Sequence, residues 1–276
     1  GKDFGVGMNP EFLREGVALK DFLAPDRIVI GGNDERSQQL IAKTYEGFEA
    51  PILQVDPTTA EIIKLASNSF LAMKISFINE IANIAEKVGS DVSSIAQGVG
   101  MDERISNKFL RAGLGYGGSC FPKDVSALYQ KSKELNVPSN LLKATIETNK
   151  IQPLRAIELL KEIYAGESLK DKRIAILGLA FKPDTDDIRD AVSVPIIEKL
   201  LEEGAIVYAT DPVAMNNFEK EIANENLHLV NSIEEVLLSS EGCILVTEWK
   251  IYKDISPEMF LELMKNPILI DGRRAY

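Results

Sequence analysis

TTAEIIKLASNSFLAMKISFINEIANIAEKVG, residues 58–89, predicts one long helix around which the rest of the chain is organised. Its first four residues form a capping-box pattern, with Thr58 as the N-cap and Glu61 reaching back. Gly89 supplies the stop at the other end. Apolar residues recur every three or four positions, as on the buried side of a helix, at Ile62, Leu65, Ala66, Phe70, Met73, Phe77, Ile81, Ile84 and Val88.

This helix is longer and more apolar than a helix on the surface of one globular domain needs to be. At 1.5 Å per residue it extends more than ~40 Å. Further apolar residues widen its apolar surface beyond one stripe, namely Ile63, Leu71, Ile75 and Ile78. We therefore expect a helix buried between two subunits, and hence a homodimer formed through it.

Residues 166–276 alternate apolar strands with helical patterns. Strands are expected at 174–177, 206–209, 227–230, 244–247 and 268–270, and helices near 189–203, 214–224, 232–240 and 256–265. Such a series predicts a parallel, doubly wound sheet of the α/β class. Ligands of these sheets bind beyond the carboxyl ends of the strands, where Asp211 and Glu248 are placed.

The remaining segments complete a prediction of three domains. Residues 1–50 contain a strand at 27–32 and a helix at 35–48, and a further strand is expected just after them at 51–55, which together are too little to enclose a core. Residues 51–165 are expected to be helical, with Asp91 capping a short helix and Gln152-Pro153 kinking a long one. Residues 166–276 form the Rossmann-like domain.

Composition limits the classes of function. The 276 residues carry a net charge of −11, which disfavours a nucleic-acid partner. The two cysteines, Cys120 and Cys243, lie far apart, which implies no disulfide framework and favours a reducing cytoplasm. No apolar run is long enough to span a membrane. Cys243 lies in an apolar strand and is expected in the core, and the single histidine, His228, leaves no histidine-rich metal site.

The segment GLGYGGSCFPKD, residues 113–124, is the strongest candidate for chemistry. Its glycines permit sharp turns and close approach to a ligand. Cys120 is expected at the start of a helix, where the positive end of the macrodipole and nearby Lys123 favour the thiolate. Asp124 is a candidate base or orienting group. The alternative is a buried structural cysteine beside a loop.

Lys64 and Asn68 lie four residues apart, on one face of the long helix. They form either a solvated polar face or a cation and an amide directed at a developing oxyanion. Gly178-Leu179-Ala180-Phe181-Lys182-Pro183 does not match the G-x-G-x-x-G pattern, nor does Gly5-Val6-Gly7-Met8-Asn9-Pro10. Lys182, Arg189 and Arg273 still offer cations for a phosphate.

Five motifs, in order along the chain, resemble those of the UDP-glucose/GDP-mannose dehydrogenase family. Residues 9–16 resemble its NPEFLxEG motif, residues 61–68 its ExxKLxxN helix and residues 117–124 its GGSCFxKD loop. Residues 178–189 resemble GxAFKxxTxDxR, and residues 271–274 resemble DGRR. The stretch from Asn9 to Gly32 resembles the UDP-glucose branch more than the GDP-mannose branch.

The resemblance implies a four-electron oxidation of a sugar 6-hydroxyl to an acid with NAD as cofactor. Cys120 would attack the aldehyde and carry a thiohemiacetal and then a thioester. Lys64 and Asn68 would hold the oxyanion, Asp124 would act with Lys64 on the proton or the water, and Glu11 would assist hydrolysis. The UDP-sugar would contact Phe12, Leu13, Tyr116, Gly117, Phe181, Lys182 and Arg273, with Arg104 reaching the partner's site. Arg189 and Glu15 would approach NAD.

The resemblance has one large departure, and several alternatives stay open. The family's glycine fingerprint and most of its NAD-binding sheet are absent from this sequence, so we expect residues 1–50 to be the tail of that domain in a fragment or a split enzyme, inactive alone. GDP-mannose or UDP-N-acetylmannosamine is an alternative substrate. Two other functions remain open, a dimeric nucleotide-sugar-binding module without catalysis and a cysteine-dependent acyl transferase.

Overall fold

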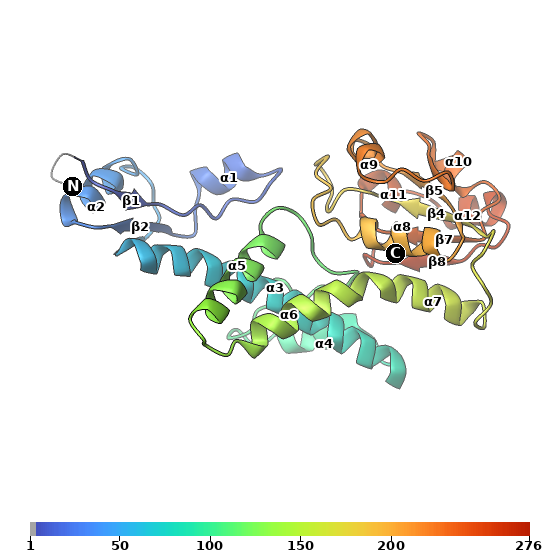
Figure 1. Cartoon of the computed structure of the whole chain (residues 1–276), viewed down its shortest axis with the longest axis horizontal. Helices are drawn as coiled ribbons and strands as arrows, with labels where there is room; N and C mark the ends of the chain where they lie inside the picture. Colours follow the sequence, from blue (N-terminus) through green and yellow to red (C-terminus); the bar gives the residue numbers. More distant parts are fainter. Residues whose placement is uncertain (1–3) are drawn as a thin grey trace. The chain divides into compact units, whose positions relative to one another are not determined.

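The computed structural model describes residues 4–276 and divides into two units, with the division between Phe70 and Leu71. Figure 1 shows the elements of each unit coloured along the sequence. The helix α3 (Pro57–Val88) begins in the first unit and continues into the second. Each unit is described by itself. The three domains predicted at residues 1–50, 51–165 and 166–276 stay a prediction.

The first unit contains a small sheet in the order β1-β2-β3. β1 (Gly7–Met8) is antiparallel to β2 (Ile28–Gly32), and β2 is parallel to β3 (Ile52–Val55). β2 is buried along its length, which confirms the predicted strand. The helices are α1 (Ala18–Leu23) and α2 (Glu35–Lys43), and α2 ends five residues before the predicted Phe48.

The long helix predicted from residue 58 is present, but its predicted cap is wrong. The side chain of Asp56 accepts hydrogen bonds from the Thr59 N–H at 3.0 Å and from the Thr59 hydroxyl at 2.5 Å. Pro57 therefore begins the helix, and Thr58 lies inside its first turn. Gly89, with φ of +70°, ends the helix as predicted.

The helical part of the second unit contains the rest of α3 and four further α-helices. Asp91 caps α4 (Val92–Gly100), as predicted. The helix after Cys120 is α5 (Phe121–Glu134), and it is followed by α6 (Asn140–Ile151). The predicted kink is a full break, since the 3₁₀ turn η1 (Gln152–Leu154) separates α6 from α7 (Arg155–Ile163).

The C-terminal part of the second unit is a five-stranded parallel sheet in the order β6-β5-β4-β7-β8. Its strands are β4 (Arg173–Leu177), β5 (Ile206–Thr210), β6 (Leu227–Leu229), β7 (Gly242–Leu245) and β8 (Leu269–Asp271). The strand predicted at 244–247 begins two residues earlier, because Gly242 and Cys243 pair with β4.

Helices cover both faces of this sheet, as the doubly wound prediction requires. Alternate residues of β4 enter different cores, Ile174 and Ile176 on one face and Ala175 and Leu177 on the other. The first core includes residues of α7, α8 (Ser193–Glu202) and α9 (Met215–Glu221). The second includes residues of α10 (Ile233–Leu237), α11 (Lys250–Lys253) and α12 (Pro257–Leu263). The short helix α11 is absent from the prediction.

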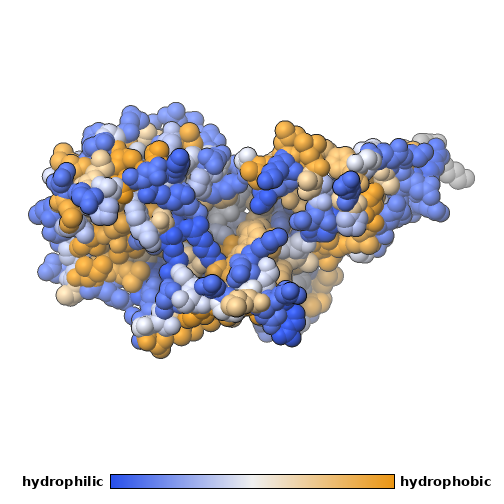
Figure 2. Space-filling model, turned by 180° about the vertical axis from the view of Figure 1, so that it is seen from behind, coloured by the Kyte–Doolittle hydropathy of each residue, from blue (hydrophilic) through white to orange (hydrophobic). Residues whose placement is uncertain are grey.

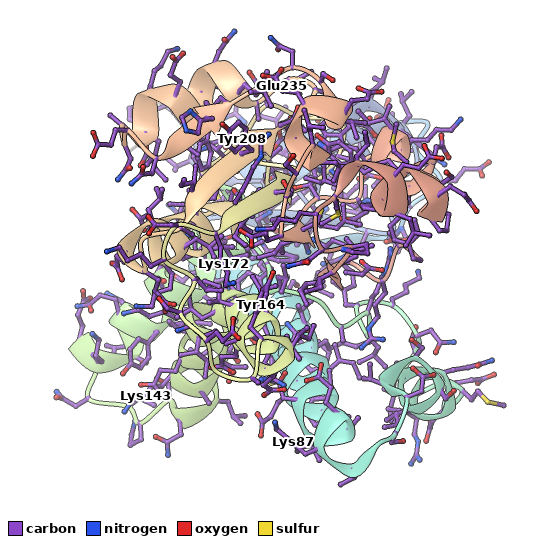
Figure 3. All side chains as sticks on the ribbon, turned by 90° about the vertical axis from the view of Figure 1, so that its right-hand side faces the viewer. Lys87, Lys143, Tyr164, Lys172, Tyr208 and Glu235 are labelled. Atoms are coloured by element: carbon purple, nitrogen blue, oxygen red, sulfur yellow. The ribbon has the colours of Figure 1, made fainter. Side chains whose placement is uncertain are left out.

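Cys243 is fully buried in the second core, as predicted, and Trp249 packs against both cores. His228 stacks on Tyr208, with ring centroids 4.6 Å apart. Tyr208 and other side chains of this unit are labelled in Figure 3, where Lys172 lies beside Tyr164. Between residues 4 and 276, no helix is both long and apolar enough to cross a membrane. The same residues contain no cluster of metal-ligating side chains.

Candidate functional site

Cys120 occupies the N-cap position of α5, with Pro122 in the first turn of that helix. The side chain is partly exposed, and the Ser119 hydroxyl lies 3.7 Å from the sulfur. The positive end of the dipole of this 14-residue helix lies at Cys120. The placement predicted from the sequence is therefore present, and the cysteine can act as a nucleophile towards a ligand in the loop.

Asp124 lies one turn into α5 and is almost completely buried. Its backbone N–H donates to the Cys120 carbonyl at 2.9 Å, which closes the first turn of the helix. Its carboxylate forms an ion pair with Lys123 at 2.9 Å. A buried carboxylate next to a cation and one turn from a thiol is suited to orienting a proton or a water.

The glycines before Cys120 are required by close packing. Gly118 has φ of +84° and donates its N–H to the Arg189 carbonyl at 2.8 Å. A Cβ at Gly117 would lie 2.2 Å from the Asp190 carbonyl oxygen, and one at Gly118 would meet the Phe181 ring at 2.7 Å. The loop before Cys120 thus packs directly on residues 181–190, which brings Gly117, Phe181 and Arg189 together.

Arg273 connects this loop to the sheet. Its side chain is 15% exposed and donates to the carbonyls of Val246 at 2.5 Å and Gly115 at 3.2 Å. Its Nε lies 3.5 Å from Glu248. Burial lowers the pKa of the guanidinium, which still carries a charge because arginine starts from so high a value. Arg273 therefore supplies a fixed cation at the carboxyl ends of β4, β7 and β8, where ligands of such sheets bind.

Tyr116 is directed into the helical part of the second unit. It is buried with Ala72 and Val125, and burial raises its pKa to about 12. The phenol is therefore neutral at physiological pH and serves as a hydrogen-bonding and packing group.

In the first unit, Lys64 and Glu11 are brought together. The Lys64 ammonium donates to the Glu11 carbonyl at 2.6 Å and to its carboxylate at 3.0 Å. The Phe12 ring lies close to two cations, with its centre 3.9 Å from the Arg27 guanidinium and 5.4 Å from the Lys64 ammonium. Asn68, one turn along α3 from Lys64, is 7% exposed. Lys64 thus forms an ion pair with Glu11, and as a cation one turn from Asn68 it is suited to binding an oxyanion.

Other predicted residues have less defined placements. Leu13 is half-buried and its N–H donates to Glu11 at 2.6 Å, and Glu15 is exposed. Arg104 is highly exposed and forms an ion pair with Asp102 at 2.5 Å. Arg189 pairs with Asp187 at 2.7 Å. The Lys182 ammonium lies 5.3 Å from the centre of the Phe181 ring.

Two residues that hold the backbone around the site, Asp211 and Asn149, were not predicted to do so. Asp211, predicted only as a polar strand end, accepts hydrogen bonds from the backbone of Leu179 and Ala180 and from the Trp249 indole. An Asp directly after a buried strand is the signal that pointed to it. Asn149 binds the backbone of Tyr116 on both sides, and no local pattern marks that residue.

Comparison with known proteins places this geometry in a family. Profiles of the UDP-glucose/GDP-mannose dehydrogenase family match residues 1–49 (NAD binding domain), 58–151 (central domain) and 175–276 (UDP binding domain). The chain belongs to this family, whose three domain profiles follow one another along it.

Curated relatives agree along nearly the whole chain. A UDP-glucose 6-dehydrogenase of Rickettsia bellii is 45% identical over 99% of this chain and 63% of its own length. The UDP-glucose 6-dehydrogenase TuaD of Bacillus subtilis is 42% identical over 99% of this chain and 59% of its own. The chain thus spans about three fifths of the length of these relatives.

Solved structures show the same likeness. A UDP-glucose dehydrogenase from Pyrobaculum islandicum matches with a TM-score of 0.91 and 40% identity over 99% of this chain and 61% of that one. A UDP-D-ManNAc dehydrogenase from Pyrococcus horikoshii matches with a TM-score of 0.86 and 28% identity, covering 99% and 62%.

Proposed function

We propose that this chain carries the nucleophile and the sugar-nucleotide site of an NAD-dependent UDP-glucose 6-dehydrogenase, which oxidises UDP-glucose to UDP-glucuronate. The observation that supports this most directly is Cys120 at the start of α5, in a glycine loop packed against Phe181 and Arg189. Relatives called UDP-glucose 6-dehydrogenase, 42–45% identical along 99% of the chain, support the choice of substrate.

In this proposal Cys120 forms the covalent intermediates. Its sulfur adds to the carbonyl carbon of the sugar aldehyde, the carbonyl oxygen takes a proton, and a thiohemiacetal results. Loss of a hydride from that carbon and of the hydroxyl proton leaves a thioester, and water then adds to release the acid and the thiol. The first oxidation converts the 6-hydroxyl to the aldehyde, and the second converts the thiohemiacetal to the thioester. Each removes two electrons, which NAD would accept.

The other predicted catalytic residues stabilise the charges that develop in these steps or orient the proton and the water. Lys64 and Asn68 donate to the oxyanion, and the ion pair with Glu11 holds the Lys64 ammonium beside Phe12. Asp124, buried one turn from Cys120, orients the thiol proton or the hydrolytic water. Glu11 assists hydrolysis of the thioester.

Substrate contacts are assigned to residues around the loop and at the sheet edge. Phe181, Lys182 and Arg273 supply a ring and two cations for the UDP part, with Tyr116 and Gly117 beside them. Phe12 and Leu13 of the first unit contact the sugar. GDP-mannose and UDP-N-acetylmannosamine remain alternative substrates, and a binding module without catalysis remains an alternative function.

The described part of the first unit offers no suitable binding site for the pyrophosphate of NAD. α2 follows Gly31 and Gly32, but the Asp34 carboxylate accepts from the Ser37 N–H at 2.8 Å and already occupies the start of that helix. An anion there would meet a like charge. We therefore assign to NAD only the predicted contacts of Glu15 and Arg189.

We also propose a homodimer formed through α3, in the cytoplasm. Phe77, Ile84 and Val88 of that helix are 50%, 53% and 71% exposed and lie seven and four residues apart, on one face. Figure 2 shows apolar side chains gathered in patches between polar ones on the surface. Arg104, which is also exposed, would reach the partner's site in such a dimer.

Calorimetric titration of the chain with UDP-glucose, GDP-mannose and NAD tests the proposal. We expect UDP-glucose to bind at least about tenfold more tightly than GDP-mannose, a difference of ~1.4 kcal/mol. An Arg273→Leu variant should lose most of that affinity, while Arg36→Leu, a control at an exposed residue of α2, should keep it. Tighter binding of GDP-mannose, or equal binding by both variants, would contradict the assignment.

A further inference from the structure

Three amide side chains bind the backbone of the loop that leads to Cys120. The Gly113 N–H donates to Asn79 at 2.7 Å, and Gln152 donates to the Gly113 carbonyl at 2.9 Å. The Tyr116 N–H donates to Asn149 at 2.8 Å, and Asn149 donates to the Tyr116 carbonyl at 2.9 Å. We call Asn79, Asn149 and Gln152 the amide clamp.

Two residues of the clamp are buried, and one of them is held by a further hydrogen bond from α3. Asn79 is completely buried and Gln152 is 4% exposed. The Gln152 amide oxygen in turn accepts from Asn83 of α3 at 2.9 Å, so residues of α3, α6 and η1 hold the loop between them. The two loop residues thus have both of their backbone polar groups satisfied by side-chain amides. Removing one amide leaves a backbone group in the protein interior without its partner, which is costly.

The clamp and the sheet domain bind alternating residues of the loop, because the clamp binds Gly113 and Tyr116 whereas the sheet domain binds Gly115 and Gly118. Gly118 is bound by the Arg189 carbonyl at 2.8 Å, and Gly115 by Arg273 at 3.2 Å. Only three residues separate Tyr116 from Cys120. A displacement of the Tyr116 backbone is therefore transmitted to the nucleophile and to the surface around Phe181.

We propose that Asn149 is a positioning residue. By hydrogen bonding to both the N–H and the carbonyl of Tyr116, it sets the placement of Cys120 and of the loop of residues 113–119 before it. Its effect on ligand binding rests on the proposed function, whereas its effect on Cys120 does not. The approach is tight, because a Cβ at Gly115 would lie 2.7 Å from the Asn149 amide oxygen. The side chain at residue 149 is therefore matched to the loop in both shape and hydrogen bonding.

Asn149→Asp separates positioning from bulk packing. It has nearly the same shape, and its carboxyl group still accepts from the Tyr116 N–H. When ionised it cannot donate to the Tyr116 carbonyl and is repelled by it, but when protonated it can donate again. The variant should thus resemble the wild type at low pH and release the loop as the pH rises through the pKa of the new carboxyl group, which its partly buried site raises.

The test measures the alkylation rate of Cys120 by iodoacetamide, followed by peptide mass spectrometry, in wild type, Asn149→Asp and Asn149→Ala. We expect Asn149→Asp to react about threefold to tenfold faster than wild type near pH 8, the range that one net hydrogen bond supplies, and equally fast near pH 5. Asn149→Ala should react faster at both pH values. Asn140→Ala, an exposed asparagine of the same helix, serves as the control and should match wild type.

Calorimetry with UDP-glucose provides the second readout, with an expected loss of about tenfold in affinity for Asn149→Ala. If the wild type binds no UDP-glucose, the proposed substrate is wrong, while the alkylation rates still decide the role of Asn149. A rate ratio for Asn149→Asp that does not change with pH would overturn the proposal. Failure of both Asn149 variants to fold, with Asn140→Ala folded, would also overturn it, since the role would then be structural.

Discussion

Asp211 follows β5 and organises the carboxyl end of the sheet through five hydrogen bonds. One carboxylate oxygen accepts from Leu179, Ala180 and the Trp249 indole at 2.8–3.1 Å. The other accepts from the backbone of Val213 and Ala214 at 3.0 and 2.9 Å. The side chain is 2% exposed. One oxygen of this buried carboxylate therefore holds the turn after β4, which leads directly to Phe181 and Lys182, and the other holds the turn after β5.

Asp211→Asn should destabilise the chain by about 2–4 kcal/mol, because an amide offers one acceptor oxygen and turns an N–H₂ towards backbone donors. Urea unfolding followed by circular dichroism measures the change, which should appear as a lower midpoint. Asp254→Asn, at an exposed aspartate, is the matched control and should leave the midpoint in place. A stability loss for Asp211→Asn no larger than that of the control would show that the five hydrogen bonds are replaceable.

The two cysteines differ in environment, and their reactivities should differ accordingly. Complete burial among apolar side chains raises the pKa of the Cys243 thiol well above its usual range. Cys120 is partly exposed at the start of α5, where a reagent can reach its sulfur. In the folded chain we expect iodoacetamide to label Cys120 and to leave Cys243 unmodified, as read by peptide mass spectrometry. Both should react in urea, and labelling of Cys243 without denaturant would contradict its placement in the core.

At the scale of single residues, the sequence predicted what local patterns encode. The glycines and Lys123-Asp124 around Cys120 marked a loop before a helix, and that arrangement is present. The partners of the loop were beyond prediction, because Asn149 is 33 residues from Tyr116 and Arg273 is 158 residues from Gly115. Such contacts depend on how helices pack, which spacing along one segment does not reveal.

Among the elements, α7 is fastened to α3 by a group of charges around Arg155. This arginine pairs with Glu86 of α3 at 2.9 Å and with Glu158 and Glu162 of α7 at 3.0 Å each, with its own side chain 12% exposed. Lys87 joins the group through Glu162 at 3.2 Å. Figure 3 labels Lys87 at the end of α3. Because Arg155 directly follows η1, the group also holds the break between α6 and α7.

Arg155→Gln should lower stability by about 2–3 kcal/mol, since it leaves three carboxylates close together without their shared cation. Hydrogen bonds from Arg155 and Lys87 lower the pKa of Glu162 in the folded state. This contribution is therefore present above the usual glutamate pKa and is lost as the pH falls through the lowered value. Urea midpoints measured from neutral pH downwards should converge for wild type and variant. Lys143→Gln, which removes an exposed pair at 3.7 Å, should change little at any pH.

The elements themselves were largely predictable, and their ends less so. The periodicity of residues 58–88 identified α3, but two capping patterns overlap at its start. In one pattern Thr58 is the N-cap and Glu61 reaches back to it. In the other Asp56 is the N-cap and accepts from Thr59, and this second pattern is the one in the structure. Pro57 explains the choice, because proline fits the first helical position and has no N–H to satisfy. The strand ends of the sheet shifted by one or two residues for a similar reason, since pairing with neighbouring strands decides them.

At the scale of the whole molecule, the alternation of apolar strands and helices was sufficient to predict the doubly wound sheet, because β4, β7 and β8 each place residues in the cores on both faces. The small sheet of residues 7–55 followed less directly. Its β3 is largely exposed, with Ile52 and Leu53 at 40% and 49%, so burial gives little pattern there. Apolar side chains that stay exposed in one chain can form an interface with a second copy. Contacts within one chain do not reveal such an interface.

Phe77 provides the test of the proposed dimer. If α3 packs against a second copy, Phe77→Glu places a charge in an apolar interface and should halve the mass measured by light scattering at micromolar concentration. Ile151→Glu is the matched control, because Ile151 is 65% exposed and lies on α6, outside the α3 face with Phe77, Ile84 and Val88. Both variants should keep the far-ultraviolet circular dichroism of wild type, since both side chains are exposed within one chain. A wild type that is monomeric, or a Phe77→Glu variant with unchanged mass, would exclude this face of α3 as the interface, and Arg104 would then have no partner's site to reach through it.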